Sequence, residues 1–438
     1  MGLVFTYLMT YGGSVVALFN PFIGLLIYIC FAIIRPEALW HWSVPPGNYS
    51  RVIALSLLVG WALRGFGDWR FGRATPIVLC LVAFLGWACI SATRALMPER
   101  AWEWIEAIGK IVLPFVVGMT VIDSTLKLKQ LAWLILLGHG YVAYELNRAY
   151  LNGFNRLQEV GFGGMDNNCL VITFVTCCGL AFFLGLSARA LWQKALAFGC
   201  LALMTHAILF SFSRGGMLGL IVVGIVAFLI TPKRLTNWLV MLAIAAVAIR
   251  LAGPEVVGRF FSTFADDQQR DVSAQSRLDM WKICADAIAS NPVFGLGPYH
   301  FPVHAAHFGL TEGKEAHSLW LQIGAELGLP GLSLLLLFYL VCIVRLWPVS
   351  RFGYPVPDPI FHDIARMVIA SLAGFMVAAQ FVSLPGLESP YYIVLIGAGA
   401  LKLLSVPQYD HIGLGAAEPS DAATEEFEEA RWQVPAAV

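Results

Sequence analysis

Long apolar runs separated by short polar segments follow one another along almost the whole chain. A helix needs about 20 apolar residues to cross roughly 30 Å of hydrocarbon, and most of the runs approach or exceed that length. They occupy residues 3–19, 21–34, 50–66, 75–93, 107–122, 129–146, 168–186, 191–211, 215–231, 236–252, 318–345, 363–384 and 388–404. Because the first two could form a single hairpin, we expect about 12–14 transmembrane helices. A membrane β-barrel would instead show alternating segments of about ten residues. The pattern predicts an all-α polytopic membrane protein.

The composition supports this fold class. Of 438 residues, 58% are hydrophobic and 13% charged, and the mean hydropathy is +0.73, which excludes an ordinary water-soluble domain. The formal net charge of zero identifies no partner. The bilayer is the one partner that the composition requires, and we expect no nucleic-acid partner.

Lysine and arginine mark every second loop, a distribution typical of the cytoplasmic face. These basic residues are Arg64, Arg70 and Arg73, Lys127 and Lys129, Arg189 and Lys194, Lys233 and Arg234, and Arg345 and Arg351. The intervening loops then face outward, among them residues 35–49, 147–167, the turn at Arg214, and the long segment 252–316. The orientation predicts that Arg214 lies on the outer side, near the membrane boundary.

The chain is predicted to form one transmembrane domain, residues 1–404, followed by a tail at residues 405–438. The tail is rich in Ala, Glu and Pro and is expected to be disordered and cytoplasmic. Residues 252–316 form one extended loop on the outer face. Within it, RLDMWKICADAIAS predicts an amphipathic helix with Leu278, Trp281, Ala285 and Ile288 on its apolar stripe. Such a helix could lie on the bilayer surface.

Three basic residues on the outer side are candidates for chemistry: Arg214, Arg277 and His317. Two arginines can bind a polyanion such as a diphosphate in bidentate fashion. His317 precedes an apolar helix, whose N-terminus would disfavour the imidazolium form and leave the ring able to accept a proton. Each residue also has an ordinary explanation. Arg214 could reach the headgroups from a helix end, Arg277 could be solvated, and His317 could be a packing residue.

Polar residues of the segment 147–168 are secondary candidates. Asp166 and Asn168 precede an apolar helix, where they could simply cap it or could bind sugar hydroxyls or tune His317. Arg148 belongs to the same outward loop. The sequence contains no HExxH, Walker A, GxGxxG, GxSxG or DxD motif, and we expect neither a metal ion nor a cofactor.

These segments together resemble the O-antigen ligase and polymerase superfamily, and in particular its exosortase-associated O-glycosylation ligases. The matching pieces are DNN at 166–168, SFSRGG at 211–216, PEVVGRFFSTF with DVSAQSRLDMW at 254–281, NPVFGLGPYHF at 291–301, HSLWLQIGAELGLPGL at 317–332 and SLAGFMVAAQFVSLPGLESPYYI at 371–393. Their order and spacing, more than any one piece, carry the likeness.

The resemblance implies a metal-independent, membrane-embedded glycosyltransferase in the bacterial inner membrane. It would take a glycan from an undecaprenyl-diphosphate carrier on the periplasmic face and pass it to a lipid or protein acceptor. It further implies that Arg214 and Arg277 hold the diphosphate and that His317 is the base. A glycine-rich GFGGM before DNN departs from the expected pattern, which leaves a role for Asp166 open.

Two other functions stay open. A polymerase that adds repeat units to a polysaccharide would share the same motifs. A flippase for lipid-linked glycans would carry ionisable residues along a path through the membrane and often pseudo-repeats, whereas the conspicuous basic residues here lie on one predicted surface. The sequence favours transfer chemistry over transport.

Overall fold

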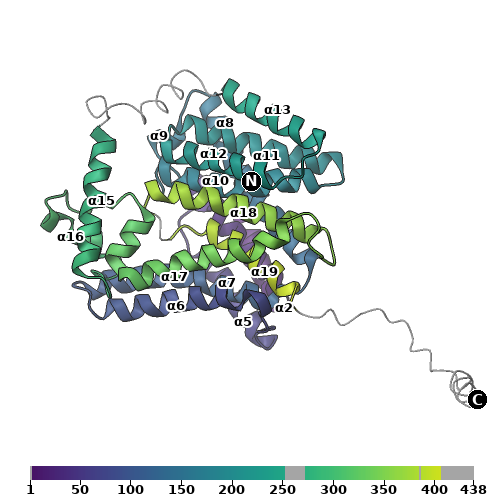
Figure 1. The fold of residues 1–438 in the computed structure, drawn as a ribbon. Coiled ribbons are helices and arrows are strands. Elements are labelled where there is room, and N and C mark those ends of the chain that lie inside the picture. Colours follow the sequence, from purple (N-terminus) through teal and green to yellow (C-terminus); the bar gives the residue numbers. More distant parts are fainter. Residues whose placement is uncertain (1, 252–271, 384–385, 406–438) are drawn as a thin grey trace, which may run out of the picture. The chain divides into compact units, whose positions relative to one another are not determined.

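The computed structural model describes residues 2–251, 272–383 and 386–405, apart from the side chains of 247–249, 251 and 272–275. These described parts are helical and contain no named strand (Figure 1). The elements are α1 (Gly2–Tyr7), η1 (Leu8–Gly12), α2 (Gly13–Phe19), α3 (Pro21–Ile34), α4 (Pro36–Leu39), α5 (Tyr49–Leu63), η2 (Gly72–Ala74), α6 (Thr75–Ala92), α7 (Pro98–Val121), α8 (Thr125–Leu151), α9 (Arg156–Glu159), α10 (Asn167–Ser187), α11 (Leu191–Phe210), α12 (Arg214–Ile230), α13 (Leu235–Leu251), α15 (Val272–Ser290), α16 (His300–His304), η4 (Ala305–Phe308), α17 (Leu319–Ser350), α18 (Ile360–Ala378), η5 (Ala379–Phe381) and α19 (Ser389–Leu403).

The predicted fold class is confirmed. Eight helical segments in the described part are long and apolar enough to cross a membrane: Gly2–Phe19, Pro21–Leu39, Gly72–Ala92, Pro98–Val121, Asn167–Ser187, Leu191–Phe210, Leu319–Ser350 and Ile360–Phe381. The shorter apolar helices Tyr49–Leu63, Arg214–Ile230, Leu235–Ala246 and Ser389–Leu403 correspond to four further predicted spans. The predicted span 129–146 lies within α8, whose mean hydropathy is lowered by Lys127, Lys129 and other polar residues. Each predicted span therefore coincides with helix over most of its described residues.

The helix α10 occupies the centre of the core, where it packs against α8, α11, α12 and α18. Small residues allow the closest approaches, as is common between membrane helices. A Cβ added at Gly179 of α10 would lie 2.7 Å from the backbone nitrogen of Ser371 on α18. Leu180 N donates to Ser371 Oγ at 3.1 Å across the same contact. α18 also contacts α12 and α17, so it joins the helices that carry the candidate residues (Figure 1).

The helix α17 is broken by a kink that the sequence analysis did not predict. Gly328 has φ 68° and ψ −175°, and Pro330 follows it. A kink interrupts the helical hydrogen bonds, and the segment after α15 uses the freed carbonyls: Leu296 N donates to Ala325 O and Gly297 N to Glu326 O, both at 2.9 Å. The kink thus fastens residues 291–297 to the start of α17.

The helix α15 confirms the predicted helix and part of the predicted stripe, because Trp281 and Ile288 are half-buried. Met280, Cys284 and Ala287 are its buried residues, whereas Leu278 is 42% exposed and Ala285 is exposed. The buried face contacts the first part of α17, where Ile288 lies against Gly324. The packed face therefore centres on Met280, Cys284 and Ala287 and leaves Leu278 and Ala285 outside it. The predicted tail from residue 406 onward and residues 252–271 of the predicted outer loop lie outside the described residues.

Candidate active site

The start of α10 is tied to the turn before α12. Asp166 caps α10, because its Oδ1 accepts a hydrogen bond from Cys169 N at 2.7 Å. Asn167 Nδ2 donates to Ser211 O at 2.8 Å. Asn168 Nδ2 donates to Asn167 Oδ1 at 3.1 Å, so its amide is held beside the same helix end. The DNN segment therefore lies directly against the SFSRGG segment.

Local hydrogen bonds place Arg214 at the first position of α12. Ser213 Oγ accepts from Gly216 N at 3.3 Å and caps the helix, and Ser211 Oγ accepts from Ser213 N at 3.1 Å. Phe212 between them has φ 56°, a left-handed conformation that is uncommon outside glycine. Arg214 is half-buried at a helix N-terminus, where the backbone dipole also favours an anion.

An aromatic contact links this turn to α15. A Cβ added at Gly215 would lie 2.8 Å from Phe381 Cβ, so the start of α12 packs directly against Phe381. The ring of Phe381 lies 6.1 Å from that of Trp281, one helical turn after Arg277. Arg277 itself is half-buried. Phe381 thus contacts both the start of α12, which carries Arg214, and the helix α15, which carries Arg277.

His317 lies immediately before the capped start of α17 in a strained conformation. Its φ is 49°, and Ser318 Oγ accepts from Leu321 N at 3.4 Å as the helix cap. Strained residues of this kind occur preferentially at functional sites. The backbone before it is also fixed, since Ala316 N donates to Gln322 Oε1 at 3.3 Å.

Arg277 and Asp166 lie near enough to His317 for their charges to affect its pKa. Burial lowers the pKa of His317, the positive charges of Arg277 and Lys314 lower it further, and the negative charge of Asp166 opposes them. The sequence predicted a neutral imidazole because of the helix N-terminus. In the structure, burial and the charge of Arg277 are the main causes of the lowered pKa. Burial, aided by Asp166, raises the pKa of Glu315. The carboxyl group of Glu315 and the imidazole of His317 thus both lie within electrostatic reach of Asp166.

Glu326, a buried acidic residue that was not among the predicted site residues, helps to fix the backbone next to His317. Glu326 is fully buried and accepts hydrogen bonds from Tyr299 N at 3.1 Å and Phe301 N at 3.2 Å. Gln322 Nε2 donates to it at 3.0 Å. Because Gln322 also accepts from Ala316 N, Glu326 connects the 299–301 turn to the backbone of His317. An acidic residue within an apolar helix was the signal available in the sequence.

Arg148 has a different environment from the other candidates. It lies in the last turn of α8 and forms an ion pair with Glu145, three residues earlier, at 2.7 Å. Its side chain is 55% exposed. The contacts that join Asp166, Asn168, Arg214, Arg277 and His317 to one another do not include it. Among the described residues, no group of three or more His, Cys, Asp or Glu side chains is placed to hold a metal ion.

Comparison with known families identifies the segment that carries these residues. Residues 199–336 match the family described as O-antigen ligase, and this range includes Arg214, Arg277 and His317. This segment is therefore similar to O-antigen ligases. Residues 2–146 match a separate family of unknown function (DUF5935). No curated protein matches the chain. The match confirms the resemblance to the O-antigen ligase superfamily, while the exosortase-associated branch stays a prediction.

Proposed function

We propose that the protein is a metal-independent ligase that transfers a glycan from undecaprenyl diphosphate to a lipid or protein acceptor on the periplasmic face of the bacterial inner membrane. What carries the proposal is the proximity of Arg277 and Asp166 to His317, both of which act on the pKa of this imidazole, together with the position of Arg277 and His317 in the segment that matches O-antigen ligases. Arg214 joins them through the contacts of Phe381 with Gly215 and Trp281.

The orientation has its own support in the positions of the basic loops. His317 precedes the first residue of α17, whereas Arg345 near its end donates to Arg73 O at 2.8 Å. Glu388 precedes α19, and Lys402 near its end donates to Met119 O at 2.6 Å. The basic residues therefore gather at the end of these helices opposite the candidate site. By the positive-inside rule that end is cytoplasmic, and the site faces the periplasm.

The proposed reaction needs removal of one proton and stabilisation of one leaving group. The neutral ring of His317 accepts the proton of the acceptor hydroxyl as its oxygen attacks the anomeric carbon of the sugar. The bond between that carbon and the diphosphate oxygen breaks, and its electron pair leaves with undecaprenyl diphosphate. Arg214 and Arg277 stabilise the negative charge that develops there. Attack from the face opposite the leaving group inverts the anomeric centre.

Product length separates this proposal from the polymerase alternative. Purified protein in nanodiscs would be incubated with the lipid-linked glycan fraction from producing cells and with candidate acceptors, with and without EDTA. A ligase gives one product of acceptor plus one intact glycan, and we expect EDTA to leave the yield unchanged. A ladder of growing chains without added acceptor would support a polymerase instead, and loss of product in EDTA would contradict metal independence.

A further inference from the structure

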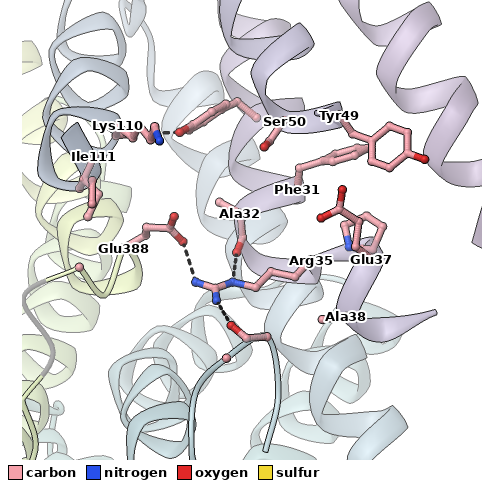
Figure 2. Close-up of a pocket in the computed structure, with 16 residues that line it drawn as sticks. Phe31, Ala32, Arg35, Glu37, Ala38, Tyr49, Ser50, Lys110, Ile111 and Glu388 are labelled. Carbon is pink, nitrogen blue, oxygen red and sulfur yellow. Dashed lines mark hydrogen bonds and ion pairs between the residues drawn. The ribbon is translucent and has the colours of Figure 1, made fainter. Parts of the chain in front are cut away.

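A cavity of about 610 Å³ lies between α3, α5 and α7 and the loops that carry Gly163 and Gly386. Its volume falls within the range of about 300–1,000 Å³ that is usual for small-molecule sites. Figure 2 shows Arg35 and Glu388 reaching toward each other at its wall, with Lys110, Phe31 and Tyr49 around it. Most of the lining comes from the segment that matches the family of unknown function.

Arg35 organises the wall of this cavity. It follows the last residue of α3 with φ 44°, and its guanidinium donates to Gly163 O at 2.5 Å and to Ala32 O at 3.4 Å (Figure 2). The same group forms an ion pair with Glu388 at 3.7 Å. A residue in a strained backbone conformation therefore holds together a helix end and two loops.

The charges of the lining indicate the class of ligand. Arg35 and Lys110 contribute two cations, and Glu37 and Glu388 contribute two carboxylates. A phosphate group would meet as many negative charges as positive ones. An uncharged sugar suits the lining better, because each hydroxyl can donate to a carboxylate and accept from a cation.

Two chain segments connect the cavity to the candidate active site. Gly164 lines the cavity, and Asp166, two residues later, acts on His317. Two residues span at most about 7 Å of chain. Gly386 and Glu388 also line the cavity, and Phe381, five residues before Gly386, packs against the start of α12. A glycan whose reacting end lies at His317 thus has a polar cavity next to it.

The geometry points to a sugar-binding subsite: we infer that this cavity binds uncharged sugar residues of the glycan beside the transfer site. The inference rests on the proposed function, and it assigns glycan recognition largely to the segment of residues 2–146, together with Glu388. Arg214 and Arg277 would hold the diphosphate, while Arg35 and Glu388 would hold sugar residues.

Two probes distinguish these sites: undecaprenyl diphosphate without sugar, and free glycan released by mild acid from the lipid-linked fraction of producing cells. Their binding to the full chain in nanodiscs would be measured for the wild type, Ala107→Trp and Glu388→Gln. Ala107 is exposed on α7 and lines the cavity, so a tryptophan there fills it. Gly109→Trp is the matched control, because an added Cβ at Gly109 meets no atom within 4 Å and this residue is not part of the lining. Glu388→Gln preserves the shape and removes one charge.

We expect Ala107→Trp to weaken binding of the free glycan at least tenfold and Glu388→Gln to weaken it several-fold. Both variants should bind undecaprenyl diphosphate within twofold of the wild type. The control Gly109→Trp should bind both probes within twofold of the wild type. Absence of glycan binding to the wild type, or unchanged glycan binding in both cavity variants, would overturn the inference. Equal weakening of both probes would also overturn it, because the cavity would then not be specific for sugar. Retention of undecaprenyl diphosphate binding by Arg277→Lys would instead count against the proposed clamp and leave the sugar result intact.

Discussion

At the scale of single residues, the central feature of the proposed site is the imidazole of His317, whose pKa is lowered by burial and by the charge of Arg277. A base must be deprotonated to act, and burial and Arg277 both keep the pKa of His317 below its ordinary value of about 6.5. The same positive charge that would bind a diphosphate therefore also prepares the base. Asp166 acts in the opposite direction and limits the shift.

The pH profile of transfer tests these charges. Because deprotonated His317 is the active form, activity should fall only as the pH drops through its lowered pKa. Asp166→Asn removes a charge that raises this pKa, so the acidic limb should move to lower pH; asparagine can still cap α10. Lys314→Gln removes a charge that lowers the pKa, so the limb should move to higher pH. Profiles of kcat/KM measured on both variants should shift in opposite directions, and a common shift or none would show that another group titrates.

Arg277→Lys tests the clamp. Lysine keeps the charge but cannot form the planar fork that binds two oxygens, and hydrogen bonds to charged groups contribute about 1.5–3 kcal/mol. We expect kcat/KM to fall by roughly 10- to 100-fold on this basis. Lys282→Gln, an exposed site on the same helix, is the control and should transfer normally. Near-normal transfer by Arg277→Lys would remove the bidentate argument.

At the scale of elements, the site depends on how α17 begins. The kink at Gly328 and the bonds of Glu326 fix the 291–301 segment and, through Gln322, the backbone of His317. Glu326→Gln replaces one accepting oxygen with an NH₂ group that faces a backbone N–H. An unsatisfied buried group costs about 1–3 kcal/mol, so the variant should unfold at a lower temperature in detergent and transfer more slowly. The exposed Glu312→Gln should do neither. An unchanged midpoint for Glu326→Gln would show that this network does not hold the segment.

The helices could be predicted from the sequence because apolar runs in a bilayer have few alternatives to helix. The full packed face of α15 could not be predicted, because it depends on the neighbouring helix α17 against which α15 packs. Met280 and Cys284 are buried on this helix, although neither belongs to the predicted stripe. Arg214, Arg277 and His317 stood out by residue type and by the resemblance. Glu326 was visible as an acidic residue in an apolar helix, but its partners and the cavity at Arg35 could not be predicted, because they arise from contacts between segments far apart in the chain.

At the scale of the whole molecule, the helices separate two chemically different ends. One end carries Arg73, Arg345 and Lys402, and the other carries His317 and Glu388. The orientation can be tested with alkaline phosphatase, which is active only outside the cytoplasm. Insertion at the exposed Gly313 should give active enzyme, and insertion at the exposed Arg189 should give inactive enzyme. The reverse result would place the candidate site in the cytoplasm and contradict use of a periplasmic donor.

The most direct test of the account is transfer by His317→Ala in purified form, with EDTA present throughout. His307→Ala, which changes an exposed histidine of the same outer segment, is the matched control. Wild type and His307→Ala should move the glycan from undecaprenyl diphosphate to the acceptor at similar rates. His317→Ala should insert into the membrane and bind the donor but give no transfer above background. Wild-type turnover by His317→Ala would contradict the proposal that this imidazole accepts the proton of the acceptor.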